Sequence, residues 1–455
     1  MTARNHPVVE AYAAHVSPAF VKLLGALGYG RVFVRAKGTR LWDHDGREYL
    51  DLLAGFGSMN LGHNPEAVIE AVRAALDDGA PSILHVGPHG PAADLAADLA
   101  RLAPPLTRCL FSTSGGEAVE SAMKLARAAT GRTAIVYADG GFHGTGLGSL
   151  SVMGSRRMRA PFEPLVPDCH AVAFGDLDAL RKALRKRPVA AVLLEPIQVE
   201  AGVVVPPAGY LAEARALCHA HGALFVLDEV QTGLGRTGAL FAYQHDDAVP
   251  DVLVLGKALG GSILPVSCAL TTPAIHDRAY GRVDRFDLHG STFSGYALGC
   301  AAARATLRAI ADHGLVDAAR ARGERLLLGL RSRLAGHPFV RGVRGRGLIV
   351  GIELGPTAKG GVLSRLLPGV VAGVSRQVFG QWLALRLLEA GFVAQPASSQ
   401  WNVLRIEPAL TVTDDEIDRA IDAIATILGE YRDLGALLAD AGARLGAQAI
   451  GGFGF

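Results

Sequence analysis

The sequence predicts an α/β protein whose large domain contains a mostly parallel β-sheet wrapped by helices. Between about residues 106 and 270, short apolar runs alternate with stretches that carry apolar residues at helical spacing. This alternation is typical of β-α-β units. The runs at 223–227 and 252–255 are aliphatic and β-branched, as expected for strands buried on both faces. At 455 residues the chain exceeds the usual size of one domain, so a large and a smaller domain are expected.

The segment before the large sheet predicts a helix followed by short strands. Strands are expected at 31–35 and 41–43, with Asp45-Gly46 as a hairpin turn. Helices are expected at 65–79 and 92–103, where apolar residues recur at i, i+3 and i+4. The predicted strands of the large sheet follow at 110–111, 134–137, 190–194, 223–227 and 252–255.

The C-terminal part predicts a smaller α+β domain. Helices are expected at 299–313 and 315–335, and strands at 347–354 and 402–406. Residues 355–375 form a Gly- and Leu-rich insertion of low charge, and the last twenty residues are either a frayed tail or a subunit clasp. The expected division is a segment 1–60 that joins the small domain, a large domain 61–330, a small domain 331–435 and a tail 436–455.

Two predicted strands each end in one charged residue. Asp228 follows Leu224-Phe225-Val226-Leu227, and Lys257 follows Val252-Leu253-Val254-Leu255-Gly256. Open α/β sheets bind ligands at the carboxyl ends of their strands. An acid for a protonated ring nitrogen and a lysine that bonds to an aldehyde are what pyridoxal phosphate requires. The alternative for this pair of residues is a buried ion pair.

A Ser/Thr/Gly turn before a helix predicts a phosphate site. Ser114-Gly115-Gly116 follows the strand at 110–111 and precedes a stretch with apolar residues at helical spacing. Backbone N–H groups of such a turn can approach an anion, and the helix N-terminus adds favourable partial charge. Gly115 and Gly116 are the predicted donors. Ordinary helix capping is the alternative, since it uses the same residue types.

These residues lie in a series of blocks that resembles the class III (ω-)aminotransferases of the fold-type I pyridoxal phosphate enzymes. The resemblance covers roughly residues 30–430. Within the family, the chain most resembles the putrescine (diamine) and the ornithine or acetylornithine aminotransferases. The blocks are 41–51, Gly55-Phe56-Gly57, Leu61-Gly62-His63-Asn64-Pro65, Ser114-Gly115-Gly116-Glu117-Ala118, Phe142-His143-Gly144, 194–202, 228–233, 235–238, Lys257-Ala258-Leu259-Gly260-Gly261, Ser291-Thr292-Phe293 and Leu404-Arg405-Ile406-Glu407-Pro408.

The resemblance implies pyridoxal 5'-phosphate as cofactor and gives roles to the residues around it. Lys257 would hold the cofactor covalently and then carry a proton to and from the substrate carbon, while Asp228 would face the ring nitrogen. Phe142 and Val230 would cover the two faces of the ring, with plain core packing as the alternative, and Gln231 would reach its 3' oxygen. The implied cofactor-binding set is Ser114, Gly115, Gly116, Phe142, His143, Asp228, Val230, Gln231, Lys257 and Thr292.

The resemblance also implies a homodimer or a higher homo-oligomer. Thr292 is similar to the threonine that dimers of this family send to the phosphate of the neighbouring subunit.

Arg405 and Glu200 are the expected substrate-binding residues. An arginine at the end of an apolar strand can clamp a carboxylate with two hydrogen bonds. Glu200 resembles the family glutamate that pairs with this arginine when the amine donor has no carboxylate, and a static salt bridge is the alternative. The usual Gln-Gly-Glu-Gly-Gly is Gln198-Val199-Glu200-Ala201-Gly202 in this chain. Two missing glycines stiffen the loop and add bulk.

The implied activity is a transaminase reaction with ping-pong kinetics. An amino group would pass from a terminal amine, such as a diamine or an ω-amino compound, to a 2-oxo acid such as 2-oxoglutarate or pyruvate. An amino-acid racemase or epimerase, or a decarboxylase, of the same fold is the first alternative, and amination of an aldehyde-ended biosynthetic intermediate is another. A cofactor-binding regulator is disfavoured because the first thirty residues are too few for a DNA-binding module.

Composition narrows the partners and the compartment. A net charge of +2 argues against nucleic acid, and no apolar run reaches the eighteen residues of a membrane span. The five cysteines lack C-x-x-C spacing, which favours reduced thiols in the cytoplasm and no zinc. No signal peptide is visible at the start. His85 and His89 are separated by Gly87-Pro88, which breaks a helix, so no metal site is expected.

Overall fold

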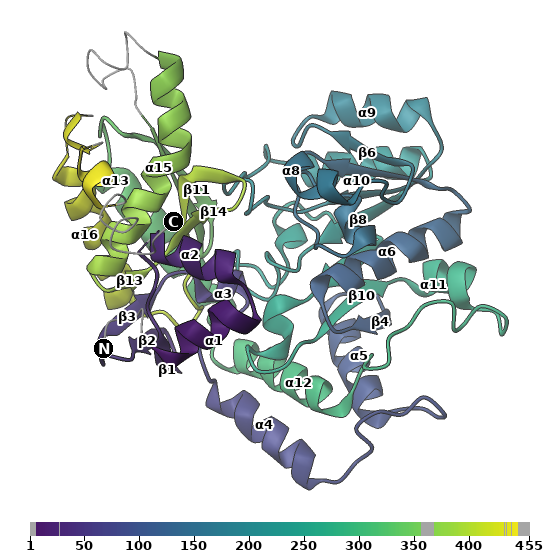
Figure 1. The fold of residues 1–455 in the computed structure, drawn as a ribbon. Coiled ribbons are helices and arrows are strands. Elements are labelled where there is room, and N and C mark those ends of the chain that lie inside the picture. Colours follow the sequence, from purple (N-terminus) through teal and green to yellow (C-terminus); the bar gives the residue numbers. More distant parts are fainter. Residues whose placement is uncertain are drawn as a thin grey trace.

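The computed structural model describes residues 6–26, 28–355, 368–431, 433, 435–437 and 439–444. Its elements form two lobes (Figure 1). One lobe is built on a seven-stranded sheet and the other on two four-stranded sheets. Within these residues, no helix is both long enough and apolar enough to cross a membrane.

The seven-stranded sheet is mostly parallel, as predicted. Its order is β4-β10-β9-β8-β7-β5-β6, and only β10 runs antiparallel to its neighbours. The strands β6 and β10 were not predicted, because both are short and contain polar residues. The strand bounds are β4 (Arg108–Ser112), β5 (Ala134–Ala138), β6 (Cys169–Val172), β7 (Val189–Leu194), β8 (Leu224–Asp228), β9 (Val252–Leu255) and β10 (Ser267–Thr271).

Helices cover both faces of this sheet, which explains its apolar strands. Successive residues of a strand point to opposite faces, and in β8 Val226 joins one apolar cluster while Phe225 and Leu227 join the other. The cluster with Val226 packs under α6 (Gly115–Thr130) and α11 (Pro273–Tyr280). The opposite face packs under α10 (Tyr210–Ala220) and α12 (Ala297–Asp312). The remaining helices of this part are α4 (Glu66–Asp77), α5 (Gly90–Leu102), α7 (Leu147–Leu150), α8 (Arg156–Arg159), α9 (Leu177–Lys186), and the 3₁₀ turns η2 (Ala160–Phe162), η3 (Ala242–His245) and η4 (Lys257–Gly260).

The N-terminal segment begins with two helices where one was predicted, α1 (Pro7–His15) and α2 (Pro18–Ala26). It continues into β1 (Phe33–Lys37), β2 (Arg40–Asp43), β3 (Glu48–Asp51) and the short α3 (Ala54–Gly57). The fourth strand of this sheet, β13 (Phe392–Val393), comes from far along the chain and pairs with β3 in parallel, Phe392 opposite Leu50.

The other four-stranded sheet belongs to the C-terminal part and is antiparallel. Its order is β11-β12-β15-β14, with β11 (Val340–Arg346), β12 (Ile349–Leu354), β14 (Gln395–Ala397) and β15 (Gln400–Ile406). The strand predicted at 347–354 is shorter than expected, because Gly347 has a φ of +55° and turns the chain between β11 and β12. The helices are α13 (Leu315–Arg333), α15 (Pro368–Glu389) and α16 (Asp414–Gly429). The predicted domain boundaries stay a prediction.

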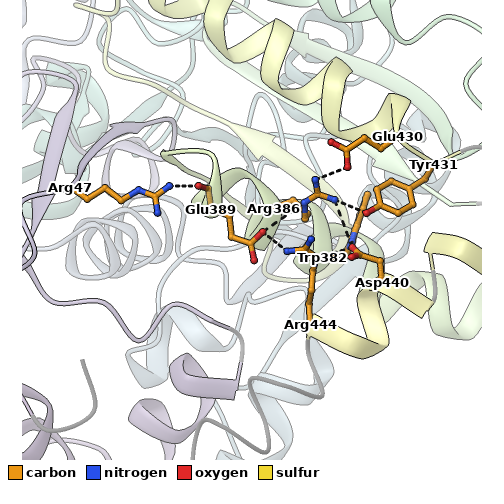
Figure 2. Close-up of polar contacts among 8 residues, drawn as sticks. All are labelled: Arg47, Trp382, Arg386, Glu389, Glu430, Tyr431, Asp440 and Arg444. Atoms are coloured by element: carbon orange, nitrogen blue, oxygen red, sulfur yellow. Dashed lines mark hydrogen bonds and ion pairs between the residues drawn. The ribbon is translucent and has the colours of Figure 1, made fainter. Parts of the chain in front are cut away.

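Residues 435–437 and 439–444 dock on α15 and form what we call the C-terminal clasp (Figure 2). The Trp382 indole donates to Asp440 Oδ2 over 2.8 Å, and Arg444 Nε donates to Asp440 Oδ1 over 2.7 Å. Arg444 also pairs with Glu389 at the end of α15. The described part of the predicted tail therefore packs on its own chain, while residues 445–455 lie outside the described residues. In the predicted insertion, 356–367 also lie outside them.

Candidate active site

A cavity lies where the parallel strands of the large sheet end. Its volume is about 190 Å³, about ten times what one water molecule needs, so it can hold an organic group. The lining joins the segments after β4, β5, β7, β8 and β9, and it includes eight of the predicted cofactor residues. The lining residues are Gly115, Gly116, Phe142, His143, Gly144, Glu195, Asp228, Val230, Gln231 and Lys257.

Glycines at one end of the cavity allow close approach of two backbone segments. A Cβ at Gly115 would lie 2.9 Å from Val230 Cγ1, and a Cβ at Gly144 would lie 2.7 Å from the Cα of Gly116. Gly144 also has a φ of +112°, which L side chains rarely adopt. Gly115 and Gly116 form the first turn of α6, where backbone N–H groups lack partners within the helix. This end therefore suits an anion.

Ser114 serves as the cap of α6 in this structure. Its hydroxyl accepts from the N–H of Glu117 over 3.3 Å, and the Glu117 carboxylate accepts from the N–H of Ser114 over 3.0 Å. Ser114 is exposed and does not line the cavity. Its predicted contact with a phosphate stays a prediction.

A buried acid and a buried histidine stand side by side in the lining of the cavity. Asp228 Oδ2 lies 2.8 Å from His143 Nδ1, and Asp228 Oδ1 accepts from the N–H of Val230 over 3.0 Å. Burial alone would lower the pKa of His143, but the Asp228 carboxylate outweighs it and the pKa is raised. A cation facing Asp228 would thus meet a carboxylate fixed through both of its oxygens.

Glu195 is a site residue that the sequence reasoning missed. It follows β7 and accepts from the N–H of Phe142 over 2.8 Å. Burial raises the pKa of Glu195 to about 8, although the nearby His143 opposes the shift. The signal for it was the one used for Asp228, a single charge after a buried apolar strand.

Lys257, Gln231 and Glu407 form a chain of hydrogen bonds that leads out of the cavity toward Arg405. Lys257 Nζ donates to Gln231 Oε1 over 2.7 Å, and Gln231 Nε2 donates to Glu407 Oε1 over 2.9 Å. Burial lowers the pKa of Lys257, against the attraction of Glu200 and Glu407. Lys257 has a φ of +44°, and such strain in a residue other than glycine is often found at functional sites. Glu407 was not predicted as a site residue, although it too ends an apolar strand.

Arg405 and Glu200 form a buried ion pair, as the resemblance implied they could. Arg405 is 1% exposed and Glu200 6% exposed, and Arg405 Nη1 donates to Glu200 Oε1. Arg405 Nη1 also lies 3.7 Å from Glu407 Oε2, and its Cζ lies 4.6 Å from the ring centroid of Phe56. Burial alone would raise the pKa of Glu200, but Arg405, Lys257 and a hydrogen bond from Ser398 hold that pKa below its usual value.

Thr292 lies apart from the cavity of its own chain. It is exposed, and its carbonyl oxygen lies 2.9 Å from His85 Nε2. Thr292 thus lies on the surface of its chain, and its contact with the phosphate of a neighbouring subunit stays a prediction.

The residues present fit pyridoxal phosphate. The cavity has a glycine-lined end at a helix N-terminus, a fixed carboxylate and a buried amine, and these match the phosphate, ring nitrogen and aldehyde of that group. Among the described residues, no cluster of His, Cys, Asp or Glu could hold a metal ion.

The chain is similar to known aminotransferases. The aminotransferase class-III family matches residues 27–428. Aminotransferase PigE of Serratia sp. (strain ATCC 39006) is 37% identical over 453 residues, which cover 93% of this chain and 53% of PigE, so the chain spans about half the length of that relative.

Two solved structures share the fold across most of both chains. The ornithine aminotransferase of Toxoplasma gondii, with pyridoxal phosphate at its active site, is 30% identical with a TM-score of 0.78, covering 91% of this chain and 92% of its own. The adenosylmethionine-8-amino-7-oxononanoate aminotransferase of Methanocaldococcus jannaschii is 28% identical with a TM-score of 0.81, covering 93% and 98%. The predicted fold type I is thereby confirmed. The chain belongs to the class-III family of pyridoxal phosphate-dependent aminotransferases.

Proposed function

We propose that this protein transfers an amino group from a compound with a terminal amine, such as a diamine or an ω-amino compound, to a 2-oxo acid such as 2-oxoglutarate or pyruvate. The observation that carries the proposal is the buried Arg405–Glu200 pair next to Lys257. A guanidinium is the group best suited to a carboxylate. When it is paired with Glu200, the same pocket presents no free positive charge to a plain amine. Ornithine aminotransferases among the similar structures support this type of donor.

The residues of the cavity have distinct tasks in this proposal. When bound, pyridoxal phosphate supplies an aldehyde for covalent attachment and a ring that accepts an electron pair. Gly115 and Gly116 would bind its phosphate with backbone N–H groups, while Phe142 and Val230 would pack on the two ring faces. Asp228, oriented by His143 and by the N–H of Val230, would keep a positive charge at the ring nitrogen.

Lys257 and Gln231 would act at the aldehyde end. The amine of Lys257, released when the substrate amine takes its place, would remove a proton from the substrate carbon that bears the amino group. In the half-reaction with the 2-oxo acid, it would return a proton to the corresponding carbon of the new amino acid. Its lowered pKa favours the neutral base that this step needs. Gln231, fixed by Glu407, would contact the 3' oxygen beside it.

The site would be completed by a second copy of the chain. Thr292 is exposed at the end of a segment with several exposed apolar side chains, among them Phe286, Leu288 and Phe293. Exposed apolar side chains of this size favour a subunit interface. Thr292 would then bind the phosphate of the neighbour. The cytoplasm remains the proposed compartment, and all five cysteines are free thiols.

The test is an activity screen of the protein loaded with pyridoxal phosphate. Diamines and ω-amino acids of increasing length are offered with 2-oxoglutarate or pyruvate, and glutamate or alanine is measured. Formation of the new amino acid in step with loss of the amine supports the proposal. Inversion of an amino acid, or release of carbon dioxide without amino transfer, would instead identify a racemase or a decarboxylase.

A further inference from the structure

Glu407 is a carboxylate that the fold seals away from solvent. It follows β15 and is 0% exposed. Its N–H donates to Leu52 O over 2.7 Å, which joins it to the N-terminal segment. In the same segment Gly57 has a φ of +73°, and a Cβ at this position would lie 3.3 Å from Glu407 Oε1 and 3.4 Å from Gln231 Cγ. The Glu407 carboxylate therefore depends on protein groups for its hydrogen bonds.

The neighbours of Glu407 leave one of its oxygens without a hydrogen bond. Oε1 accepts from Gln231 Nε2 over 2.9 Å. Oε2 lies 3.7 Å from Arg405 Nη1 and has no hydrogen-bond donor among the described residues. Burial lowers the pKa of Arg236 to about 10, against the attraction of Glu407 and Asp51, so a second guanidinium nearby is charged at neutral pH. A buried carboxylate with one unbonded oxygen is costly to the fold, which points to a task in the site.

The bond to Glu407 decides the orientation of the Gln231 amide. An ionised carboxylate accepts hydrogen bonds and donates none, so Gln231 must turn its Nε2 toward Glu407. Gln231 Oε1 then points the other way, where it accepts from Lys257 Nζ over 2.7 Å. Among the described residues, these are the two hydrogen bonds of the Gln231 side chain. Without Glu407, the amide could turn its NH2 group toward Lys257 and place a donor against a donor.

We propose that Glu407 is a positioning residue that fixes the Gln231 amide, so that a carbonyl oxygen and not an NH2 group faces the amine of Lys257 and the substrate amine that takes its place. Glu407 lies behind Gln231, outside the lining of the cavity, and so acts without touching the cofactor or the substrate. Because a carbonyl oxygen stabilises an ammonium group, the arrangement favours donors with a positively charged terminal amine. The inference rests on the proposed function, which gives Lys257 and the substrate amine the same place in turn.

The protonation of Lys257 reports the orientation of the amide. Burial lowers the pKa of Lys257, and charged groups from several elements act on the same amine. The titratable and charged groups that act on it are Glu200, Glu407, Arg405, Asp228 and Glu195. An NH2 group turned toward Lys257 would disfavour the ammonium form and lower the pKa further. Loss of the negative charge of Glu407 acts in the same direction, so the two effects must be separated.

The experiment is a double-mutant cycle of Glu407→Ala and Gln231→Ala. The full chain is labelled before it is loaded with pyridoxal phosphate, with a trace of acetic anhydride at a series of pH values. Only the neutral amine reacts, so the labelling rate of the Lys257 peptide in mass spectrometry gives the pKa of Lys257, with the exposed Lys124 as internal reference. Glu407→Ala should lower this pKa by about one unit, the effect of one hydrogen bond to a charged group. In the Gln231→Ala background most of that fall should vanish.

Glu200→Ala is the matched control. Its carboxylate also attracts Lys257 but has no hydrogen bond to Gln231 among the described residues, so its effect should be the same in both backgrounds. If Glu407→Ala does not fold, the cycle is run with Glu407→Gln. That variant keeps the size of the side chain and can donate as well as accept, so it no longer fixes the amide and should lower the pKa of Lys257 less than alanine does.

Two results would overturn the inference. A fall of the same size in both backgrounds would show that Glu407 acts by its charge alone, and no fall in either would show that it has no influence on Lys257. The activity screen of the wild type decides the proposed function separately. If the wild type transfers amino groups while the cycle shows no coupling, the role of Glu407 is wrong and the proposed function stands. If the cycle shows coupling while the wild type transfers no amino group, the amide is positioned as inferred and the proposed function is wrong.

Discussion

Replacement of Arg405 by alanine should separate the two substrates of the reaction. Under the proposed function, a 2-oxo acid would exchange one carboxylate partner of Arg405 for another, because its own carboxylate would take the position of Glu200. In Arg405→Ala the same carboxylate would enter a pocket that holds Glu200 and Glu407 and no guanidinium. The variant should therefore raise the KM for 2-oxoglutarate far more than the KM for a diamine.

The magnitude follows from the burial and the partners of Arg405. Its side chain is 1% exposed, so the lost contact is a desolvated, charge-assisted pair, worth about 2–4 kcal/mol. The two carboxylates that remain near the vacated position would also repel the carboxylate of the acceptor. At about 1.4 kcal/mol for each factor of ten, the kcat/KM for the acceptor should fall about 30- to 1000-fold.

The assay varies each substrate while the other is saturating, and single-turnover absorbance of the cofactor reports the amine half-reaction alone. Arg405→Lys is the matched variant, since it keeps the charge and loses the two-pronged geometry, and it should fall between the wild type and alanine. Equal losses in both half-reactions of Arg405→Ala would refute the reasoning and would show that the ion pair serves only the fold.

Four further predictions concern the cofactor, the assembly and stability. Borohydride should fix pyridoxal phosphate on a peptide that contains Lys257, found by mass spectrometry, and a label on Lys124 instead would contradict the assignment. Thr292→Ala should lose cofactor faster on dialysis while light scattering still shows a dimer; a wild type that is fully active as a monomer would argue against a shared site. The pKa of Glu195 is raised from 4.5 to about 8, so between these pH values the folded state binds one more proton than the unfolded state, and stability falls as pH rises through them. Glu195→Gln should flatten this fall when the thermal unfolding midpoint is plotted against pH. Parallel plots for the variant and the wild type would contradict the prediction. Asp440→Ala should lower the free energy of unfolding by about 1–3 kcal/mol, since the Trp382 indole and Arg444 lose their acceptor, with no change in cofactor binding.

The cofactor side of the cavity could be predicted because it follows a local rule. Asp228 and Lys257 each come directly after a buried strand, and parallel strands bring their carboxyl ends to one edge. The same rule applied to Glu195, which follows β7, would have found it, whereas Glu407 follows β15 of the antiparallel sheet and lies outside the rule.

The contacts that depend on distant parts of the chain could not be predicted. Ser398 meets Glu200 only because β15 pairs with β12 and brings its turn over the loop. In the sequence, Arg344 is an ordinary charged residue of the predicted C-terminal part. Its hydrogen bonds to the carbonyl oxygens of Gly202 and Val203 join segments that lie far apart in the sequence. The C-terminal clasp depends on the hydrogen bond from the Trp382 indole to Asp440, and hydrophobic periodicity in the sequence carries no information on such a pairing.

The pairing of β3 with β13 has a consequence for how the chain is made. The N-terminal sheet receives its fourth strand from Phe392–Val393, and Leu52 receives a hydrogen bond from the N–H of Glu407. The strands of the large sheet, by contrast, all lie between Arg108 and Thr271. During synthesis from the N-terminus, the large sheet therefore has all its strands while the first sixty residues still lack their partners. Tyr49, Leu50 and Leu52 therefore lack these partners until the chain up to about residue 407 has been synthesised. Apolar surface that is exposed during this interval favours aggregation.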